Sequence, residues 1–361
     1  MRVVIAGGGT AGHVNPALAV AGALGSDVVF LGTRRGSEAR LVPAAGWPLE
    51  TLEVRGFDRS RPWSIIRTAG VAGRAVFIAR RLLSSHRPDV LLGMGGYVSL
   101  PACIAARSLR IPVALHEQNI VLGLANRTCK PLARRIAVSF EETLAKVGRK
   151  GVYTGNPVRR DFVDADVAAA KDRGLEAFGL EPERKTLLVF GGSQGAKRIN
   201  DASAGLADVW RDSGNRQVLH IAGPDHADRI RSLTASPGKL VYRVVAYVDD
   251  MVAAYAVADL VLCRGGATTV SELGVTGAPS IIVPYPYHRD RQQERHGAVL
   301  QRAGAAVMVP DESATTERIA GIAGRLLDDD DARAKMRAAA LELGRPDAAG
   351  QVAALLKELA A

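Results

Sequence analysis

The stretch VVIAGGGTAGHV, at residues 3–14, decides the expected fold class of this chain. An apolar run that predicts a buried strand leads directly into a glycine turn, and a helical pattern opens near Pro16. The second half repeats this order in LLVFGGSQGAK, at residues 187–197. A strand, a glycine turn and a helix in succession are typical of a parallel sheet with helices on both faces. The sequence therefore predicts an α/β protein with one such turn at the head of each half.

The rest of the chain favours two domains. Its 361 residues suit two cores of ordinary size. Short apolar runs alternate with amphipathic helical patterns, and the tail after Pro346 predicts one more amphipathic helix. The expected strands lie at residues 3–6, 28–31, 49–53, 90–92, 113–115 and 135–138 in the first half, and at residues 186–190, 218–221, 240–244, 260–262, 280–283 and 306–309 in the second.

Composition excludes several classes of protein. The three cysteines, Cys103, Cys129 and Cys263, are odd in number and widely spaced, which gives neither a disulfide framework nor a zinc pattern. A reducing cytoplasm is expected, without a signal peptide. The longest uncharged stretch, residues 90–106, is interrupted by glycines and a proline and is shorter than the roughly 20 apolar residues of a spanning helix. The acidic run at residues 328–331 is interpreted as a helix cap, and no metal site is predicted.

Charge is distributed unevenly along the chain. The net charge is +10; residues 1–161 hold 23 Lys and Arg against 10 Asp and Glu, whereas the remainder holds 24 against 27. The basic first half calls for an anionic partner, which could be nucleic acid, a phosphate-bearing substrate or an acidic membrane surface. No nucleic-acid-binding module is recognisable, so nucleic acid is not expected.

A basic and apolar segment at residues 55–87 favours a membrane. It holds eight arginines and one acid, Asp58, interleaved with apolar residues from Trp63 onward. A helix with one apolar and one basic face suits an anionic membrane interface. The alternative is a helix that faces the core and keeps a solvated basic side. The loop at residues 120–122 is expected to add apolar contact.

The glycine turns are candidate anion sites, because glycine permits close backbone approach and the N–H groups at a helix start attract phosphate. Residues 7–12 also fit the dinucleotide pattern GxGxxG. A dinucleotide site requires an acid at the end of the second strand to hold the ribose, whereas that strand here ends in LGTRR, at residues 31–35. A purely structural role of each turn is the alternative.

Further polar motifs follow other expected strands of the first half. HEQN at residues 116–119 and GMGGY at residues 93–97 are expected at the same sheet edge as the first turn. At the junction of the halves, GNPVR at residues 155–159 ends in Arg159, which could reach a diphosphate or serve as a solvated hinge arginine.

The second half adds two motifs that suit a nucleotide sugar. CRGGATTVSE, at residues 263–272, places Glu272 in the first turns of a helix, where its carboxylate can accept both hydroxyls of a ribose. Gln292 and Gln293, in DRQQ at residues 290–293, suit sugar hydroxyls because amides both donate and accept. Adjacent helix residues point in different directions, so one glutamine is expected to contact any one sugar.

Together these motifs resemble those of the MurG family, the undecaprenyldiphospho-muramoylpentapeptide β-N-acetylglucosaminyltransferases of peptidoglycan synthesis. The resemblance rests on GGTAGH, GMGGY, HEQN, GNPVR, GGSQGA and DRQQ in that order, and it extends from end to end of the chain. It implies a GT-B glycosyltransferase, with two Rossmann-like doubly wound domains facing across a cleft. It further implies an inverting transfer of N-acetylglucosamine from UDP-GlcNAc to the C4 hydroxyl of the muramoyl sugar of lipid I, forming lipid II and UDP without a cofactor.

The resemblance also implies a role for each half. Residues 1–160 would form the acceptor and membrane-facing domain, with the helix at residues 346–361 packing back on it, and residues 161–345 would bind UDP-GlcNAc. The protein would lie at the cytoplasmic face of the cell membrane as a peripheral protein. Within the second half, Glu272 would hold the ribose, the Tyr247-Val248 backbone the uracil, and Ser193 with its loop the diphosphate. The implied donor-binding residues are Thr10, Ala11, Gly12, Asn119, Arg159, Ser193, Val248, Ala267, Glu272, Gln292 and Gln293, of which Ala267 and the two glutamines would contact the sugar.

An inverting transfer needs a base that removes the proton of the acceptor hydroxyl. His13 is the preferred candidate, because an imidazole changes its charge near neutral pH and this one lies at the rim of the first turn. His116 and Glu117 are the rival candidates. Ala11 departs from the family pattern, which commonly has glycine there, so its backbone must keep a negative φ or bear a modest cost.

Three alternatives stay open from the sequence. Another GT-B enzyme is disfavoured by HEQN and DRQQ, and an NAD(P)-dependent oxidoreductase by the missing ribose acid and the second glycine turn. A non-catalytic membrane scaffold is disfavoured by the density of polar motifs at the expected strand ends.

Overall fold

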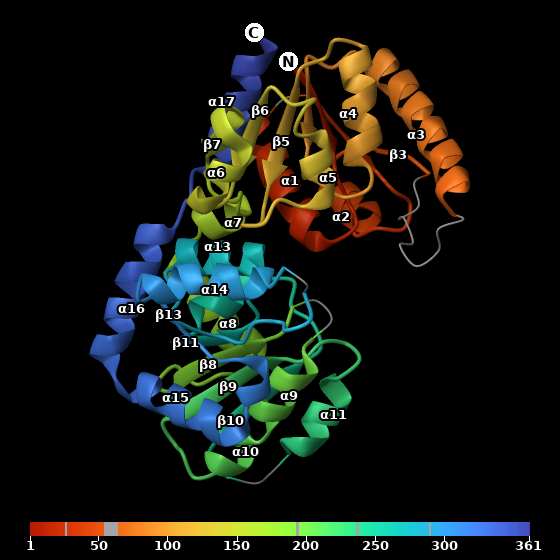
Figure 1. Cartoon of the computed structure of the whole chain (residues 1–361). Helices are drawn as coiled ribbons and strands as arrows, with labels where there is room; N and C mark the ends of the chain where they lie inside the picture. The colour runs from red at the N-terminus through yellow and green to blue at the C-terminus, as the bar shows by residue number, and fades with distance from the viewer. Residues whose placement is uncertain (26, 54–63, 193–194, 236–237, 289) are drawn as a thin grey trace. The chain divides into compact units, whose positions relative to one another are not determined.

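The computed structural model describes residues 1–25, 27–53, 64–192, 195–235, 238–288 and 290–361, and only the backbone of residues 64–72 (Figure 1). The described chain divides into two compact units. The N-terminal unit comprises Met1–Arg160 together with Arg345–Ala361, and the C-terminal unit comprises Asp161–Gly344. Each unit holds one parallel sheet covered by helices.

The N-terminal unit is built on a seven-stranded sheet of order β3-β2-β1-β4-β5-β6-β7, in which every strand pair is parallel. Each strand expected from the sequence is present. β7 is absent from the sequence expectation, because only three residues form it and a glycine begins it. The strands are β1 Arg2–Ala6, β2 Asp27–Gly32, β3 Leu49–Thr51, β4 Val90–Gly93, β5 Val113–Glu117, β6 Arg135–Val138 and β7 Gly151–Tyr153.

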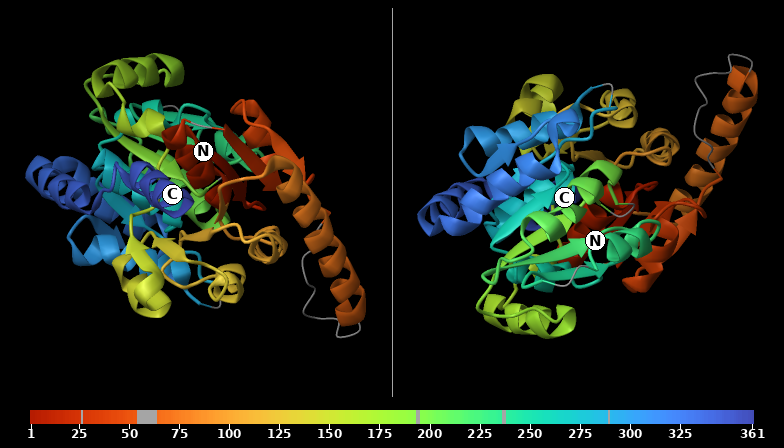
Figure 2. Two further views of the ribbon diagram at one scale, coloured as in Figure 1. Left: turned by 90° about the horizontal axis from the view of Figure 1, so that it is seen from above. Right: turned by 90° about the horizontal axis from the view of Figure 1, so that it is seen from below.

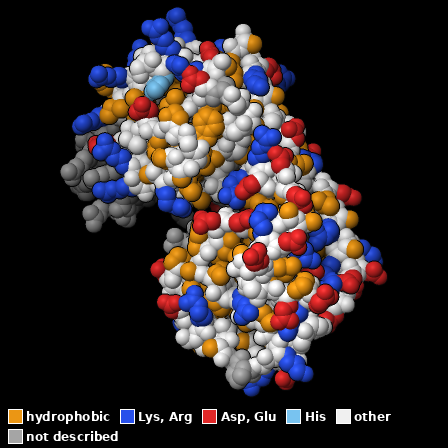
Figure 3. Space-filling view, turned by 180° about the vertical axis from the view of Figure 1, so that it is seen from behind, with side chains coloured by type: hydrophobic (Ala, Val, Ile, Leu, Met, Phe, Trp, Pro, Cys, Tyr) orange, Lys and Arg blue, Asp and Glu red, His pale blue; other side chains and the backbone are white. Residues whose placement is uncertain are grey.

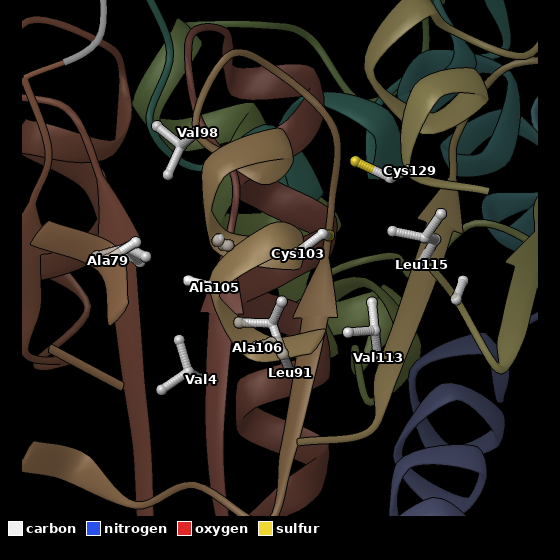
Figure 4. Packing of buried hydrophobic residues seen from close by; sticks show 14 of the residues in the cluster. Val4, Ala79, Leu91, Val98, Cys103, Ala105, Ala106, Val113, Leu115 and Cys129 are labelled. Atoms are coloured by element: carbon white, nitrogen blue, oxygen red, sulfur yellow. The ribbon is translucent and has the colours of Figure 1, made fainter. Parts of the chain in front are cut away.

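Helices cover both faces of this sheet. On one face α1 (Ala11–Leu24) and α17 (Ala348–Ala360) pack together, where Val20 and Leu356 belong to one buried cluster. On the other face lie α3 (Ser64–His86), α4 (Ser99–Ser108) and α5 (Leu124–Cys129), and Figure 4 shows their side chains packed with those of the strands. Both views of Figure 2 place α3 at the outer margin of the unit. The remaining helices are α2 Glu38–Ala44, η1 Glu141–Thr143, α6 Leu144–Val147 and η2 Gly148–Lys150.

The first helix corrects one expectation. It begins at Ala11 rather than near Pro16, which lies inside it. Proline favours the first turn of a helix, which is why the sequence places the start there. The glycine turn instead delivers the chain straight into the helix, with Thr10 in an extended conformation as the N-cap. Ala11 is not among the residues of positive φ, so it adopts the turn without left-handed strain.

The C-terminal unit repeats the design with a six-stranded parallel sheet of order β10-β9-β8-β11-β12-β13. All of its strands were expected from the sequence. The strands are β8 Lys185–Phe190, β9 Arg216–Ile221, β10 Val241–Val245, β11 Leu260–Cys263, β12 Ser280–Ile282 and β13 Ala306–Met308. The helices are α7 Arg160–Val163, which begins at the unit boundary, α8 Val167–Phe178, α9 Lys197–Ala204, α10 Leu206–Val209, α11 Ala227–Leu233, α12 Met251–Ala256, α13 Ala267–Thr276, α14 Gln292–Arg302, η3 Asp311–Ser313, α15 Thr316–Asp328 and α16 Asp330–Leu343.

The strand orders locate the candidate sites. In each sheet the chain proceeds outward from the first strand in one direction and then returns to its other side, so the direction reverses between β1 and β4 and between β8 and β11. Ligands of open α/β sheets bind outside the carboxyl ends of the strands at such a switch point.

The acidic run at residues 328–331 forms a cap, as expected: the Asp329 carboxylate accepts a hydrogen bond from the backbone of Ala332 at the start of α16. None of the described helices is long and apolar enough to cross a membrane.

Candidate active site

His13 lies at the switch point of the N-terminal sheet, in the first turn of α1. Its ring Nδ1 is 2.9 Å from Oε1 of Gln118, and its side chain is partly exposed. Gln118 follows β5 and is buried. The Nε2 atom of Gln118 lies 3.1 Å from the carbonyl oxygen of Met94 and 3.0 Å from Nδ1 of His116. One buried amide therefore joins the first helix to the ends of β4 and β5.

His116 and Glu117 are buried at the end of β5. Burial lowers the pKa of His116 to about 4, so its imidazole is neutral at pH 7. The Glu117 carboxylate accepts hydrogen bonds from the backbone and side chain of Asn119 and from the side chain of Asn126. These contacts hold the loop that follows β5. The burial of both side chains argues against the expectation that either rivals His13 as a base.

The buried carboxylate of Glu38 accepts hydrogen bonds from the first glycine turn and from Thr33. One of its carboxylate oxygens accepts a hydrogen bond from the backbone N–H of Gly9 at 2.8 Å, and the other accepts from the backbone and hydroxyl of Thr33 at 2.8 and 2.7 Å. Burial alone would raise the pKa of this carboxyl, but the hydrogen bonds from Thr33 and Gly9 hold it below its ordinary value. The side chain is 1% exposed, so a carboxylate is built into the turn.

The glycines of the GMGGY motif bring a second turn against the first. A Cβ on Gly96 would lie 2.5 Å from the carbonyl oxygen of Gly8, and Gly96 has a φ of +77°. A Cβ on Gly95 would lie 3.5 Å from the ring of His13. Glycine is therefore required at residue 96 for close backbone approach and a left-handed conformation. The two turns and His13 form one compact group at this switch point, as the sequence predicted.

A cavity of about 510 Å³ lies at the carboxyl end of the C-terminal sheet. The second glycine turn forms one wall, with Gly192 and Gly195 at φ +97° and +74°. A Cβ on Gly195 would lie 2.2 Å from the carbonyl oxygen of Ala222, so glycine is required there. Ser193 lies outside the described residues. The cavity is lined by Gly191, Gly195, Ala196, Lys197, Arg198, Asp201, Arg264, Tyr285, Tyr287, Gln293 and Asp311.

Basic side chains surround this cavity, and acidic neighbours position them. Lys197, the first residue of α9, lies 2.7 Å from a carboxylate oxygen of Asp201. Arg264 is buried, lies 2.5 Å from Asp311, and places its guanidinium 5.7 Å from the ring centre of Tyr285. No side chain caps the start of α9 among the described residues. Uncapped N–H groups beside cations are typical of a phosphate site.

Glu272 lies in α13 on the same edge of the sheet, directly after β11. Its Oε2 is 3.2 Å from the hydroxyl of Tyr255, which is buried. The ring of Tyr255 makes edge contacts with Phe162 and Phe190, at centroid distances of 5.6 and 5.9 Å. Burial, followed by the charge of Glu272, raises the pKa of Tyr255 well above its usual range, so the hydroxyl stays protonated and can donate to the carboxylate. Aromatic packing thereby fixes one oxygen of Glu272.

The two glutamines begin α14 and have different surroundings. Gln293 lines the cavity, and its Oε1 accepts a hydrogen bond from the backbone of Tyr285 at 2.9 Å. Gln292 donates to Asp290 at 2.6 Å, and its Oε1 is buried without a hydrogen-bond partner among the described residues. The hydroxyl oxygen of Thr268, in α13 next to Ala267, is also buried and has no hydrogen-bond partner within the described part of the chain. Water or a ligand can supply the missing hydrogen bonds of such buried atoms.

Comparison with known proteins identifies the family. Residues 3–138 match the glycosyltransferase family 28 N-terminal domain, and residues 186–352 match the glycosyltransferase family 28 C-terminal domain. Two curated relatives are each named UDP-N-acetylglucosamine–N-acetylmuramyl-(pentapeptide) pyrophosphoryl-undecaprenol N-acetylglucosamine transferase. The relative from Halothermothrix orenii is 35% identical, covering 100% of this chain and 99% of its own length, and the one from Nocardioides sp. is 41% identical, covering 99% and 98%. This chain belongs to glycosyltransferase family 28.

Solved structures agree with this family 28 assignment. The crystal structure of MurG from Acinetobacter baumannii is similar, with a TM-score of 0.78, 29% identity and 99% of each chain covered. The UDP-GlcNAc 2-epimerase of Neisseria meningitidis has a TM-score of 0.72 at 16% identity, covering 99% of this chain and 100% of its own, and it shows a likeness of fold alone. The expected GT-B fold class, with two Rossmann-like domains, is confirmed.

Several contacts in this family 28 glycosyltransferase were not predicted from the sequence. Glu38 and Tyr255 each act through a contact with a residue far away in the chain, which no local pattern reveals. Gln118 belongs to the predicted HEQN motif, and only its contact with His13 was missed. Asn156, in the GNPVR motif, is buried, and neither polar atom of its side chain has a hydrogen-bond partner within the described ranges. Its motif was a usable signal, although the sequence reasoning chose Arg159, which is partly exposed at the end of the N-terminal unit.

Proposed function

We propose that this chain transfers N-acetylglucosamine from UDP-GlcNAc to the C4 hydroxyl of the muramoyl-pentapeptide of lipid I, with inversion, forming lipid II and UDP in peptidoglycan synthesis. The observation that carries this proposal is the full-length likeness to relatives named for that transfer. The two switch points add chemical support, because one offers a partly exposed imidazole and the other a basic cavity beside a glycine turn.

The C-terminal unit is the proposed donor site. The second glycine turn, with Ser193, holds the diphosphate next to Lys197 and Arg198, which line the same cavity. Glu272 accepts the ribose hydroxyls, and the backbone at Val248 reads the uracil. Ala267, Gln292 and Gln293 bind the sugar. The buried oxygens of Thr268 and Gln292 support this part of the proposal, because sugar hydroxyls would supply their missing hydrogen bonds.

The N-terminal unit is the proposed acceptor side and carries the base. Nε2 of His13 takes the proton of the C4 hydroxyl, whose oxygen then bonds to C1 of N-acetylglucosamine. The bond from C1 to the diphosphate oxygen breaks, and its electron pair leaves with UDP. Cations and helix N–H groups at the diphosphate stabilise the departing charge. Thr10, Ala11, Gly12, Asn119 and Arg159 complete the donor contacts from this unit.

His116 and Glu117 have supporting roles in this proposal. Glu117 accepts hydrogen bonds from Asn119, and it thereby holds the loop that presents that residue. Nδ1 of His116 accepts a hydrogen bond from the amide of Gln118, which in turn contacts His13. Both act through other residues rather than on substrate, because both are buried.

We propose that the N-terminal unit docks on an anionic membrane, at the cytoplasmic face of the cell membrane. On the face shown in Figure 3, Lys and Arg side chains outnumber acidic ones over this unit, whereas the C-terminal unit mixes both signs. The described part of α3 turns Ala75, Ala79 and Leu83 into the core, as the core-facing alternative expected. Its outer side exposes Phe77, at 68%, among arginines. The burial of these residues agrees with the core-facing alternative, and contact of the outer side with a membrane is our proposal.

Burial argues against the apolar contact expected from residues 120–122. Ile120 is only 5% exposed, and Leu122 packs against the core. Leu124, at the start of α5, is 54% exposed, and Ile104 on α4 is 39% exposed. These two residues and Phe77 are the apolar side chains that we propose to enter the interface.

Release of UDP from UDP-GlcNAc, measured with and without a lipid I analogue, tests the reaction. The proposal expects release that depends on the lipid and that falls strongly when UDP-glucose replaces the donor. Release that ignores the lipid, or that is equal with both donors, would refute it.

Vesicle binding tests the membrane proposal. Binding to anionic vesicles should weaken with salt and in a Phe77→Ser/Arg81→Glu variant. Lys335→Glu, which changes an exposed lysine on α16 of the C-terminal unit, is the matched charge control and should bind as the native chain does. Equal binding to neutral vesicles at every salt concentration would contradict the electrostatic part.

A further inference from the structure

The side-chain amide of Gln118 lies between two histidines, and chemistry fixes its orientation. The atom 3.1 Å from the carbonyl oxygen of Met94 must be the NH₂ group, because a carbonyl oxygen only accepts hydrogen bonds. The same NH₂ group faces Nδ1 of His116 at 3.0 Å. The amide oxygen therefore points at His13, whose Nδ1 lies 2.9 Å away.

This orientation determines the proton positions on both imidazole rings. An amide oxygen accepts, so Nδ1 of His13 must carry the proton and donate it to Gln118. The neutral ring then has its lone pair on Nε2. At His116 the sense is reversed: Nδ1 accepts from Gln118, and Nε2 donates to the carbonyl oxygen of Gly155 at 3.3 Å. The low pKa of His116, about 4, keeps that ring neutral and able to accept.

The hydrogen bonds of Gln118 and His116 end on backbone carbonyl oxygens, one at each end of the series. The Met94 carbonyl belongs to the turn after β4, and the Gly155 carbonyl belongs to the loop after β7. Gln118 and His116 are 2% and 0% exposed, so water does not compete for these hydrogen bonds. The free histidine side chain in water prefers the opposite tautomer, with the proton on Nε2. The buried amide is therefore the group that selects the tautomer of His13.

We propose that Gln118 is a positioning residue that holds His13 in its Nδ1-protonated tautomer and thereby leaves Nε2 as the nitrogen that accepts the acceptor's proton. This inference rests on the proposed function, in which His13 is the base. A neutral amide suits this role because it accepts a hydrogen bond from the ring without adding a negative charge next to it.

Nitrogen-15 NMR of the full chain, labelled at histidine, tests the tautomer directly. The signals of His13 are assigned by their loss in His13→Ala, and spectra are recorded at a pH where the ring is neutral. The native protein should show a protonated Nδ1 and an unprotonated Nε2. In Gln118→Ala the pattern should move toward a protonated Nε2.

Kinetics provides the second readout. Gln118→Ala should lower kcat by about 10- to 100-fold, within the range of a mispositioned general base, and leave the KM for UDP-GlcNAc within about twofold. Calorimetric binding of UDP, which reports on the C-terminal unit, should be unchanged, and a native-like circular dichroism spectrum and thermal unfolding transition should confirm that the N-terminal unit of the variant is folded.

The outcomes separate this inference from the proposed function. A native tautomer in Gln118→Ala, or an unchanged kcat, would overturn the positioning role. The tautomer of His13 is measured without substrate. A failure to transfer N-acetylglucosamine would therefore refute the proposed function, whereas the NMR spectra would still test the effect of Gln118 on the tautomer.

Discussion

The carboxylate of Glu38 lies 2.8 Å from the backbone nitrogen of Gly9 and accepts its hydrogen bond. In Rossmann folds the N–H groups of this first turn commonly face a phosphate. Here a buried side chain of the protein occupies the partner position, and its negative charge opposes a phosphate at Gly9. The second turn has different surroundings, because Lys197, Arg198 and Arg264 lie around its cavity together with two carboxylates, Asp201 and Asp311. The two turns, alike in sequence, therefore differ in the charge of what faces them.

Removing the Glu38 carboxylate should destabilise the N-terminal unit. Glu38→Ala leaves the N–H of Gly9 and the groups of Thr33 without this partner, and we expect a loss of about 1–3 kcal/mol in the free energy of unfolding at pH 7. Denaturant unfolding measures this change. Glu53→Gln, which alters an exposed carboxylate after β3, is the control and should change stability by less than about 0.5 kcal/mol. A Glu38→Ala protein as stable as the control would contradict the built-in role of the carboxylate.

The same carboxylate predicts a pH dependence. Its pKa in the folded protein lies below the ordinary value of 4.5, so the charged form stabilises the fold above pH 4.5. As the pH falls below 4.5 and through the folded pKa, that contribution is lost. The stability difference between the native chain and Glu38→Gln should therefore shrink with acid. A difference that grows as the pH drops would show that the sign is wrong.

Buried neutral histidines predict a second loss of stability in acid, at a higher pH. Burial lowers the pKa of His220 to about 3 and that of His116 to about 4, against an ordinary value of 6.5. Below pH 6.5 the unfolded chain takes up protons that the folded chain does not, so stability falls with pH at up to about 1.4 kcal/mol per unit for each histidine. Unfolding free energies measured from pH 7 to pH 4.5 check this slope. Stability that is constant over this interval would be inconsistent with buried neutral rings.

Tyr255 should affect donor binding through Glu272. Tyr255→Phe keeps the aromatic packing and removes the hydroxyl that lies 3.2 Å from the carboxylate. We expect the Kd for UDP to rise by about 2- to 10-fold, which corresponds to the loss of one hydrogen bond. Tyr242→Phe is the matched control, because it removes a buried hydroxyl that contacts His220 and Ser203 instead. The control should lose stability but keep its UDP affinity; equal losses of affinity in both variants would exclude a specific role for Tyr255.

The sequence was sufficient for the sheets, the turns and the family, because these depend on local patterns. The strand-turn-helix stretches at residues 3–14 and 187–197 each combine an apolar run with glycines that the backbone requires, as the positive φ of Gly9 and Gly195 shows. β7 lay beyond this reasoning, since three residues at a sheet edge carry too little pattern.

The inner contacts of the candidate site could not be predicted from local pattern. His116 and Glu117 were expected at a ligand-facing edge because polar residues rarely fill a core, yet both are buried, since neighbouring amides satisfy them. The role of Gln118 depends on the carbonyl of Met94, which approaches only in the folded chain. Such pairings are decided by tertiary packing, and the sequence therefore indicates the motif without the role of each member.

His13 is expected to dominate the rate of the chemical step. His13→Ala should lower kcat by about 100- to 10,000-fold and leave the affinity for UDP unchanged, because His13 is not among the proposed donor contacts. Single-turnover transfer and UDP binding measure the two effects separately. Near-normal turnover would remove His13 from the role of base.

The chemical structure of the product is the most direct test of the proposed transfer. The native enzyme is incubated with UDP-GlcNAc and a lipid I analogue, and the purified product is examined by NMR for the position and anomeric configuration of the new bond. We expect a β-linked N-acetylglucosamine on C4 of the muramoyl sugar, with one UDP released for each bond formed. An α-linkage, a bond at another hydroxyl, or free N-acetylglucosamine as the sole product would contradict it.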